Sequence, residues 1–157
     1  MPNTPPLANP SSPNALASAN ARIERYVMDS HALFALLQKE KGHESVVRLI
    51  ERAEANDATL YLSLINGGEI FYIVEREQGI QVAEELVADI DALPIVLAGV
   101  DRVRVESAAH FKSKYAVSYA DAFAIALARE LGATLVTGDP EIRSVEKIVS
   151  VLWLEND

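Results

Sequence analysis

Short, almost continuously hydrophobic runs alternate along this chain with longer segments in which apolar residues recur at helical spacing. The hydrophobic runs predict strands at residues 24–28, 59–62, 95–98, 134–137 and 148–153. The longer segments predict helices at residues 31–40, 43–56, 64–77, 80–92, 100–114 and 119–131, and a short helix from Pro140. Hydrophobic strands separated by helices are typical of a parallel sheet covered on both faces. We therefore expect a three-layer α/β/α domain with a central parallel sheet of four to five strands.

The first 22 residues differ in composition from the rest of the chain. They hold five of the seven prolines and, apart from Arg22, no charged residue. We therefore expect residues 1–22 to be a disordered tail and residues 23–157 to form one domain. No apolar run approaches the roughly 20 residues needed to cross a bilayer, and the chain has no cysteine. These features predict a cytoplasmic protein with no membrane span.

Four carboxylates end or interrupt hydrophobic stretches: Asp29, Glu69, Asp121 and Asp139. Asp29 and Asp139 follow predicted strands, at the edge of the sheet where open α/β proteins form their functional crevice. Glu69 and Asp121 fall in helices with almost no polar face. A buried carboxylate costs free energy unless it gains a partner or a cation. Together the four acids predict a binding site for a divalent metal ion.

Three of these acids also have a purely structural explanation, and the two explanations are compatible. Asp139 stands before a proline as a helix N-cap would, and Ser118 and Asp121 match the S-x-x-D capping box. Asp29 could be a polar turn residue. Glu69 is harder to explain in this way because its neighbours at helical spacing are apolar. We also expect the helix dipole to lower the pKa of Asp121.

The segments around the four acids read YVMDSHALFALL, SLINGGEI, SYADAFAIA and LVTGD. In this order they resemble the four motifs of the PIN domain, specifically of VapC-type ribonuclease toxins from toxin–antitoxin pairs. The resemblance runs from about residue 25 to residue 153. It implies catalytic and metal-ligand roles for Asp29, Glu69, Asp121 and Asp139, with supporting hydroxyl groups from Ser30 and Thr137. Mg²⁺ or Mn²⁺ suits such an all-oxygen site.

The resemblance also implies an activity and partners. It implies a metal-dependent endoribonuclease that hydrolyses RNA phosphodiester bonds, a cognate antitoxin that blocks the pocket, and a homodimer. Hydrolysis by an activated water in line with the leaving oxygen would leave 5′-phosphate and 3′-hydroxyl ends. We expect the apolar helices near residues 31–56 and 64–74 to supply the dimer surface. The alternative is a PIN-like module that binds RNA or a protein without cleaving.

The charge of the chain limits how it can hold RNA. A net charge of −9 excludes nucleic-acid binding through bulk charge. Local basic residues must therefore position the phosphates, and Lys112 and Lys114, which precede the Asp121 motif beside an aromatic residue, are the candidates.

Other folds with comparable sites fit the sequence less well. A haloacid-dehalogenase-like phosphatase requires a second aspartate two residues after the first, where this chain has His31. A phosphorelay receiver domain requires a lysine that closes a late strand, and none follows the strands predicted at 134–137 and 148–153. Dinucleotide binding is unsupported because the chain has no G-x-G-x-x-G motif.

Overall fold

The computed structural model describes residues 22–154, so the tail predicted at residues 1–22 lies, apart from Arg22, outside the described residues. Within this range a parallel sheet has five strands in the order β3-β2-β1-β4-β5. The strands are β1 (Glu24–Met28), β2 (Ala58–Ser63), β3 (Ile95–Ala98), β4 (Thr134–Thr137) and β5 (Val151–Trp153). The helices are α2 (Ser30–Gln38), α3 (His43–Glu54), α4 (Leu64–Gln78), α5 (Ile80–Asp91), α6 (Arg102–Lys114), α7 (Tyr119–Leu131) and the 3-10 helix η1 (Pro140–Val145).

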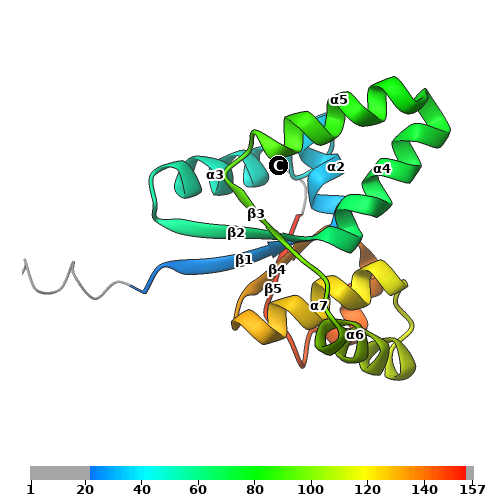
Figure 1. Ribbon diagram of the computed structural model, residues 1–157. Coiled ribbons are helices and arrows are strands. Elements are labelled where there is room, and N and C mark those ends of the chain that lie inside the picture. The colour runs from blue at the N-terminus through cyan, green and yellow to red at the C-terminus, as the bar shows by residue number, and fades with distance from the viewer. Residues whose placement is uncertain (1–21, 155–157) are drawn as a thin grey trace, which may run out of the picture.

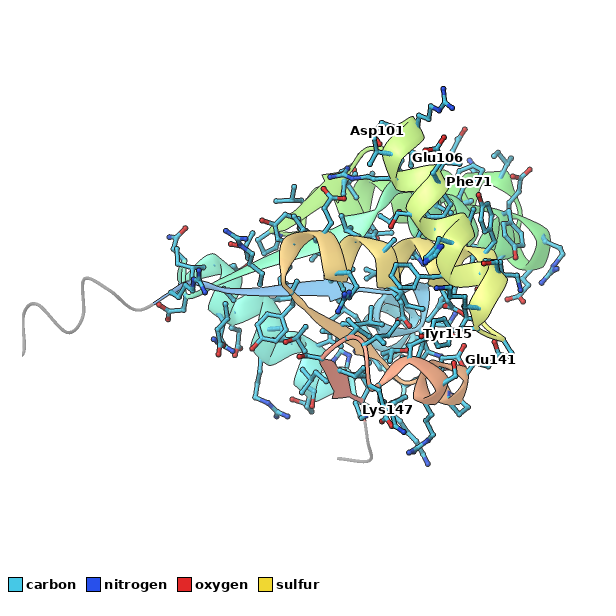
Figure 2. All side chains as sticks on the ribbon, turned by 90° about the horizontal axis from the view of Figure 1, so that it is seen from below. Phe71, Asp101, Glu106, Tyr115, Glu141 and Lys147 are labelled. Atoms are coloured by element: carbon cyan, nitrogen blue, oxygen red, sulfur yellow. The ribbon has the colours of Figure 1, made fainter. Side chains whose placement is uncertain are left out.

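Helices cover both faces of the sheet, which confirms the predicted three-layer α/β/α architecture (Figure 1). Helices α2 to α5 lie on one face, and α6, α7 and η1 lie on the other. Successive side chains of a strand point to opposite faces of the sheet, so the protein has one hydrophobic core on each face. Val27 and Leu135 pack with α7 on one face, and Met28 and Val136 pack with α2 on the other. Side chains fill the space between the sheet and both helical layers (Figure 2). Burial of both faces explains why the strands are so rich in apolar residues.

Helix α7 is buried along residues 122–128, which include four alanines. It packs against α6, α4 and the three central strands. The small alanine side chains let the helix lie close to the sheet, so the position of its first turn is tightly constrained. Asp121 lies in that first turn, and the packing of α7 therefore determines where its carboxylate points.

The predicted boundaries lie within two residues of the observed ones, except at the start of the last strand. The strand expected at residues 148–153 covers only Val151–Trp153, because the amides of Ile148 and Val149 bond the carbonyl of Val145 in a turn. The helix expected at 31–40 ends at Gln38, because Lys39 adopts a left-handed backbone conformation with φ of 53°. Among the described residues, no helix is both long and apolar enough to span a membrane.

Candidate metal centre

The order of the strands reverses between β1 and β4, which are the neighbouring strands that precede Asp29 and Asp139. Helices leave the sheet in opposite directions at such a point, so a crevice opens beyond the carboxyl ends of the two strands. The topology therefore brings two of the predicted acids to the place where open α/β proteins bind ligands.

Asp29 begins α2 as its N-cap. Its Oδ1 accepts a hydrogen bond of 2.8 Å from the amide of Ala32. The residue is only 1% exposed, and Oδ2 has no hydrogen-bond partner among the described residues. Burial raises the pKa of Asp29 to about 7, although the Thr137 hydroxyl and the Ala32 amide partly offset this effect. The negative charges of Asp121 and Asp139 raise it further.

Asp121 forms the capping box that the sequence pattern suggests. Its amide donates to Ser118 Oγ at 3.0 Å, and its Oδ2 accepts from the Ser118 amide at 3.2 Å. Asp121 is buried, and this burial raises its pKa, opposite to the lowering expected from the helix dipole. Ser118 and the nearby His31 lower the pKa, whereas Asp139 raises it. The cap uses Oδ2, so Oδ1 remains available to a cation.

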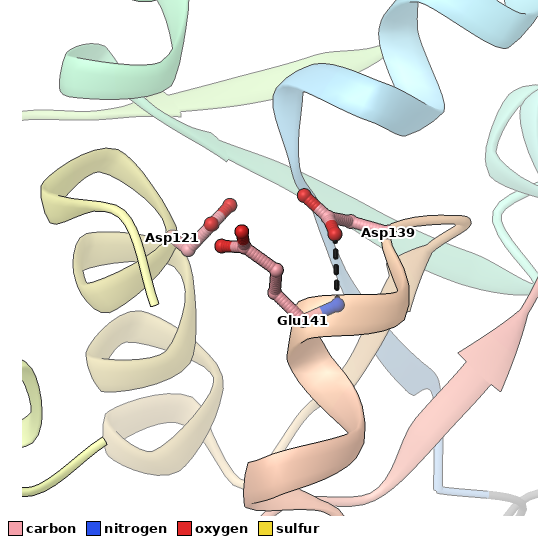
Figure 3. Close-up of side chains that lie close together, drawn as sticks. All are labelled: Asp121, Asp139 and Glu141. Atoms are coloured by element: carbon pink, nitrogen blue, oxygen red, sulfur yellow. Dashed lines mark hydrogen bonds between the residues drawn. The ribbon is translucent and has the colours of Figure 1, made fainter. Parts of the chain in front are cut away.

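Asp139 caps η1 through a hydrogen bond of 2.9 Å from the Glu141 amide to its Oδ1, and its own amide donates to Thr137 Oγ1 at 3.0 Å. The side chain of Glu141 turns towards Asp121 (Figure 3). One carboxylate oxygen from each of Asp121, Asp139 and Glu141 lies within 4.8 Å of the other two. Glu141 is exposed and its side chain has space to turn into water. Its inward orientation therefore brings like charges together, which a bound cation would offset.

Glu69 lies on α4 and is linked through Ser30 to the start of α2, directly after β1. The Ser30 hydroxyl donates to Glu69 Oε2 and accepts a hydrogen bond of 3.2 Å from Asn66 Nδ2. Ser30 is buried and Asn66 is completely buried, whereas Glu69 is half-buried. Because Ser30 follows Asp29 directly, this link holds Glu69 near the end of β1.

The structure brings three of the four predicted acids together directly, whereas Glu69 is linked to them only through Ser30, and the carboxylate oxygens within 4.8 Å of one another belong to Asp121, Asp139 and Glu141. Asp29, Asp121 and Asp139 interact electrostatically, Thr137 lies beside Asp29, and Ser30 holds Glu69. The sequence interpretation missed Asn66 and Glu141. Asn66 precedes Glu69 by three residues and so shares its helix face, and Glu141 lies two residues after a predicted cap. Both spacings were visible in the sequence.

The two lysines predicted to contact RNA lie at the end of α6. Lys112 Nζ donates a hydrogen bond of 2.7 Å to the carbonyl of Val117 and so ties the end of α6 to the loop before α7. Lys114 is exposed. Within residues 22–154, neither lysine forms an ion pair with an acid of the cluster. Lys112 therefore has a structural contact, and RNA contact by either lysine stays a prediction.

The donor atoms fit a hard divalent cation. The candidate ligands are all carboxylate oxygens, which Mg²⁺ and Mn²⁺ prefer. In the described part of the chain, no arginine, lysine or histidine forms an ion pair with Asp29, Glu69, Asp121, Asp139 or Glu141. Buried carboxylates without a basic partner are costly, and the unpartnered Oδ2 of Asp29 is such a group. A cation would satisfy this oxygen and offset the clustered charge.

The fold and the clustered carboxylates define an α/β protein with an acidic centre at a sheet edge. The PIN domain family model matches residues 26–148, so this chain belongs to the PIN domain family. A comparison of the sequence with curated proteins finds no match.

Solved structures with a similar fold include VapBC complexes and a VapC toxin. VapBC2 from Rickettsia felis, bound to a DNA fragment from its promoter, matches with a TM-score of 0.64 and 13% identity over 82% of this chain and 97% of that chain. VapC20 from Mycobacterium tuberculosis, a sarcin-ricin loop cleaving toxin, matches with a TM-score of 0.61 and 19% identity over 76% and 94%. DNA-bound VapBC from Salmonella typhimurium matches with a TM-score of 0.61 and 18% identity over 82% and 97%. At these identities the likeness shows the fold.

Proposed function

We propose that this protein is a metal-dependent endoribonuclease that acts as the toxin of a toxin–antitoxin pair. The observation that carries the proposal is the buried, unpartnered Oδ2 of Asp29 beside Asp121 and Asp139, in a group of acids that forms no ion pair with a basic side chain among the described residues. Membership of the PIN domain family supports a nuclease. The fold is also similar to that of a toxin that cleaves the sarcin-ricin loop, which supports RNA as the substrate.

The proposed ligands of Mg²⁺ or Mn²⁺ are the four predicted acids, with Glu141 as an additional carboxylate. When bound, the cation would make a water molecule more acidic and offset the charge that develops on the phosphate. The chain itself prepares the site, because the hydrogen bonds that cap α2, α7 and η1 orient Asp29, Asp121 and Asp139 in the absence of a ligand. A site whose ligands are already oriented loses less conformational freedom when it binds.

RNA positioning is the part of the proposal that depends on local charge. The net charge of −9 repels a polyanion, so contacts by individual cations have to hold the phosphates near the acids. Lys112 and Lys114 remain the proposed contacts. Lys114 is the better candidate of the two, because the ammonium group of Lys112 already bonds the Val117 carbonyl.

We expect two kinds of protein partner, a cognate antitoxin and a second copy of the chain. The similar VapBC structures support the first. Three apolar residues of α3, Val46, Leu49 and Ile50, pack into the core. They are therefore not available to the proposed dimer surface. Exposed apolar side chains remain on α4 at Leu64 and Tyr72. Beside Leu64, an apolar groove of about 270 Å³ lies between α4, α5 and β3.

One observation favours the alternative, a PIN-like module that binds RNA or a protein without cleaving. Asp29 and Asp139 are helix N-caps, and Asp121 completes the capping box of α7. Capping alone would be a reason for a chain to retain these three residues. It does not explain the inward orientation of Glu141 or the hydrogen bond between Ser30 and Glu69.

The test is to map 5′ ends in total cellular RNA after incubation with the full-length protein and Mg²⁺ or Mn²⁺. Parallel samples contain EDTA or the Asp121→Asn variant. We expect new 5′-phosphate ends that require both the metal and Asp121. No new ends in any sample, from protein that is folded and free of antitoxin, would support the non-cleaving module instead.

A further inference from the structure

Asn66 is a buried polar residue to which the proposed chemistry assigns no role. It lies in the first turn of α4, three residues before Glu69, and is 0% exposed. Its Nδ2 donates to Ser30 Oγ at 3.2 Å, and the Ser30 hydroxyl donates to Glu69 Oε2. Its own Oδ1 has no hydrogen-bond partner in the described part of the chain.

The hydrogen bonds of Ser30 show what Asn66 does. A serine hydroxyl has one proton, and two acceptors lie near it: Glu69 Oε2 and, at 3.4 Å, the backbone carbonyl of Asn66. The bond to the carboxylate is the stronger because the acceptor is charged. The amide nitrogen of Asn66 can only donate, so it occupies a lone pair of Oγ and leaves the proton for Glu69. A reversed amide would place Oδ1 against Ser30 and compete for that proton.

The amide of Asn66 is costly for the fold. A buried oxygen without a partner destabilises the folded state, and an apolar side chain of similar size would avoid that cost. The other buried residues of α4, Ile70 and Val74, are apolar. Polar groups that are retained at a cost to stability are expected where function requires them.

We infer that Asn66 is a positioning residue that acts through Ser30 to orient the Glu69 carboxylate for metal binding. With Oε2 held by Ser30, Oε1 of Glu69 remains available as a ligand. This inference rests on the proposed function, because the orientation of Glu69 matters only if the centre binds a cation. Partners that orient metal ligands in this way typically contribute about 10-fold to 100-fold to affinity.

The test measures Mn²⁺ binding to the full-length protein by isothermal titration calorimetry, and thermal unfolding in EDTA. Asn66→Leu removes both the donor and the unpartnered oxygen, so we expect Mn²⁺ affinity to fall about tenfold while the unfolding temperature stays equal or rises. Ser30→Ala should weaken binding similarly. The double variant should be no weaker than the weaker single variant, because both changes break one connected chain of bonds. Asn66→Ala gives the same comparison if leucine does not fit.

Val74→Ala is the matched control, because it is a buried change on the same helix that lies outside this chain of bonds. It should lower the unfolding temperature and leave Mn²⁺ affinity within about twofold. Wild-type affinity in Asn66→Leu, an equal loss of affinity in Val74→Ala, or additive losses in the double variant would each overturn the inference while the proposed function stands. If the wild-type protein binds no Mn²⁺, the proposed function fails and the inference fails with it.

Discussion

The two ends of strand β1 carry acids in opposite environments. Glu24 begins the strand at the surface, where it bonds Arg52 at 2.5 Å and the Tyr26 hydroxyl at 2.8 Å. The hydrogen bond from Arg52 lowers the pKa of Glu24, and the Tyr26 hydroxyl lowers it further. Asp29 follows the strand at its other end, buried and without an ion-pair partner, and burial raises its pKa to about 7. The two acids are only five positions apart, yet the structure favours the charged form of Glu24 and disfavours the charged form of Asp29.

This difference separates a structural acid from a candidate functional one. At the amino end of the strand the protein itself supplies the opposing charge, so nothing further is needed to keep Glu24 ionised. At the carboxyl end the neighbours of Asp29 are further acids, which destabilise its charged form. The anionic form of such a group costs stability, and a cation from outside the chain would offset that cost. The carboxyl end of the strand is therefore the candidate binding site, and the amino end is not.

The largest expected effect is on catalysis. Asp29→Asn removes a proposed metal ligand, and loss of the several kcal/mol that a metal contributes corresponds to a decrease of about 10³-fold in cleavage rate. The measurement is the initial rate of RNA cleavage at saturating Mg²⁺. Glu24→Gln, at the other end of β1, is the control and should retain the wild-type rate within about twofold. Full activity in Asp29→Asn would show that Asp29 is not needed for cleavage and would contradict its proposed role as a metal ligand.

The next effect is on stability without metal. The pKa of Asp29 is about 7 in the folded protein against a usual value of 3.8. Between about pH 4 and pH 7, therefore, Asp29 keeps its proton in the folded state and has lost it in the unfolded state. Stability from this group is present below pH 4, falls as pH rises and is lost above pH 7. We expect Asp29→Asn to remove this decline and to stabilise the metal-free protein at pH 8 by up to about 4 kcal/mol.

Urea denaturation in EDTA at pH 5, 6, 7 and 8 measures this effect. The control is Glu24→Gln, whose curve should keep the decline of the wild-type protein through pH 7. An equal decline in Asp29→Asn and in the wild-type protein would show that Asp29 does not carry the proton.

A smaller effect is on metal affinity. The ligand form of Asp29 is the carboxylate, so binding requires that its proton leave. With the pKa of Asp29 at about 7, the ionised fraction rises about tenfold between pH 6 and pH 8. Mn²⁺ affinity should rise by a similar factor, and titration calorimetry in buffers of different ionisation enthalpy should detect proton release. An affinity that does not change across this range would contradict the assignment.

The smallest effect is at the paired end of the strand. Glu24→Gln breaks an exposed ion pair, so we expect only a slight fall in unfolding temperature. Because the pKa of Glu24 is lowered, its contribution is present at neutral pH and is lost as pH falls below the usual glutamate range. Thermal unfolding in 1 M NaCl should reduce the difference from wild type, since salt screens exposed charges. The effect of Asp29→Asn should persist in the same salt.

Much of the fold and part of the site could be read from the chain. Hydrophobic runs and helical spacing predicted the element order and the parallel sheet. This works because burial of one or two faces of an element requires apolar residues at regular spacing along the sequence. The same logic located Asp29 and Asp139 at strand ends and Asp121 at the start of a buried helix. It did not predict the length of β5. Ile148 and Val149 are as apolar as the strand residues, but their amides bond the carbonyl of Val145 in a turn before the strand begins.

By itself, the sequence determined which segments are strands and helices and which acids interrupt them, since both depend on neighbours within a few positions. Only the tertiary structure decided which polar groups meet. Ser30 reaches Glu69 across 39 positions, and Asn66 reaches Ser30 across 36. Those contacts exist because β1 lies between β2 and β4 in the sheet, which places the turns after three strands around one crevice. Hydrogen bonding depends on distance and direction in space, and the spacing of residues along a chain does not record either across such separations.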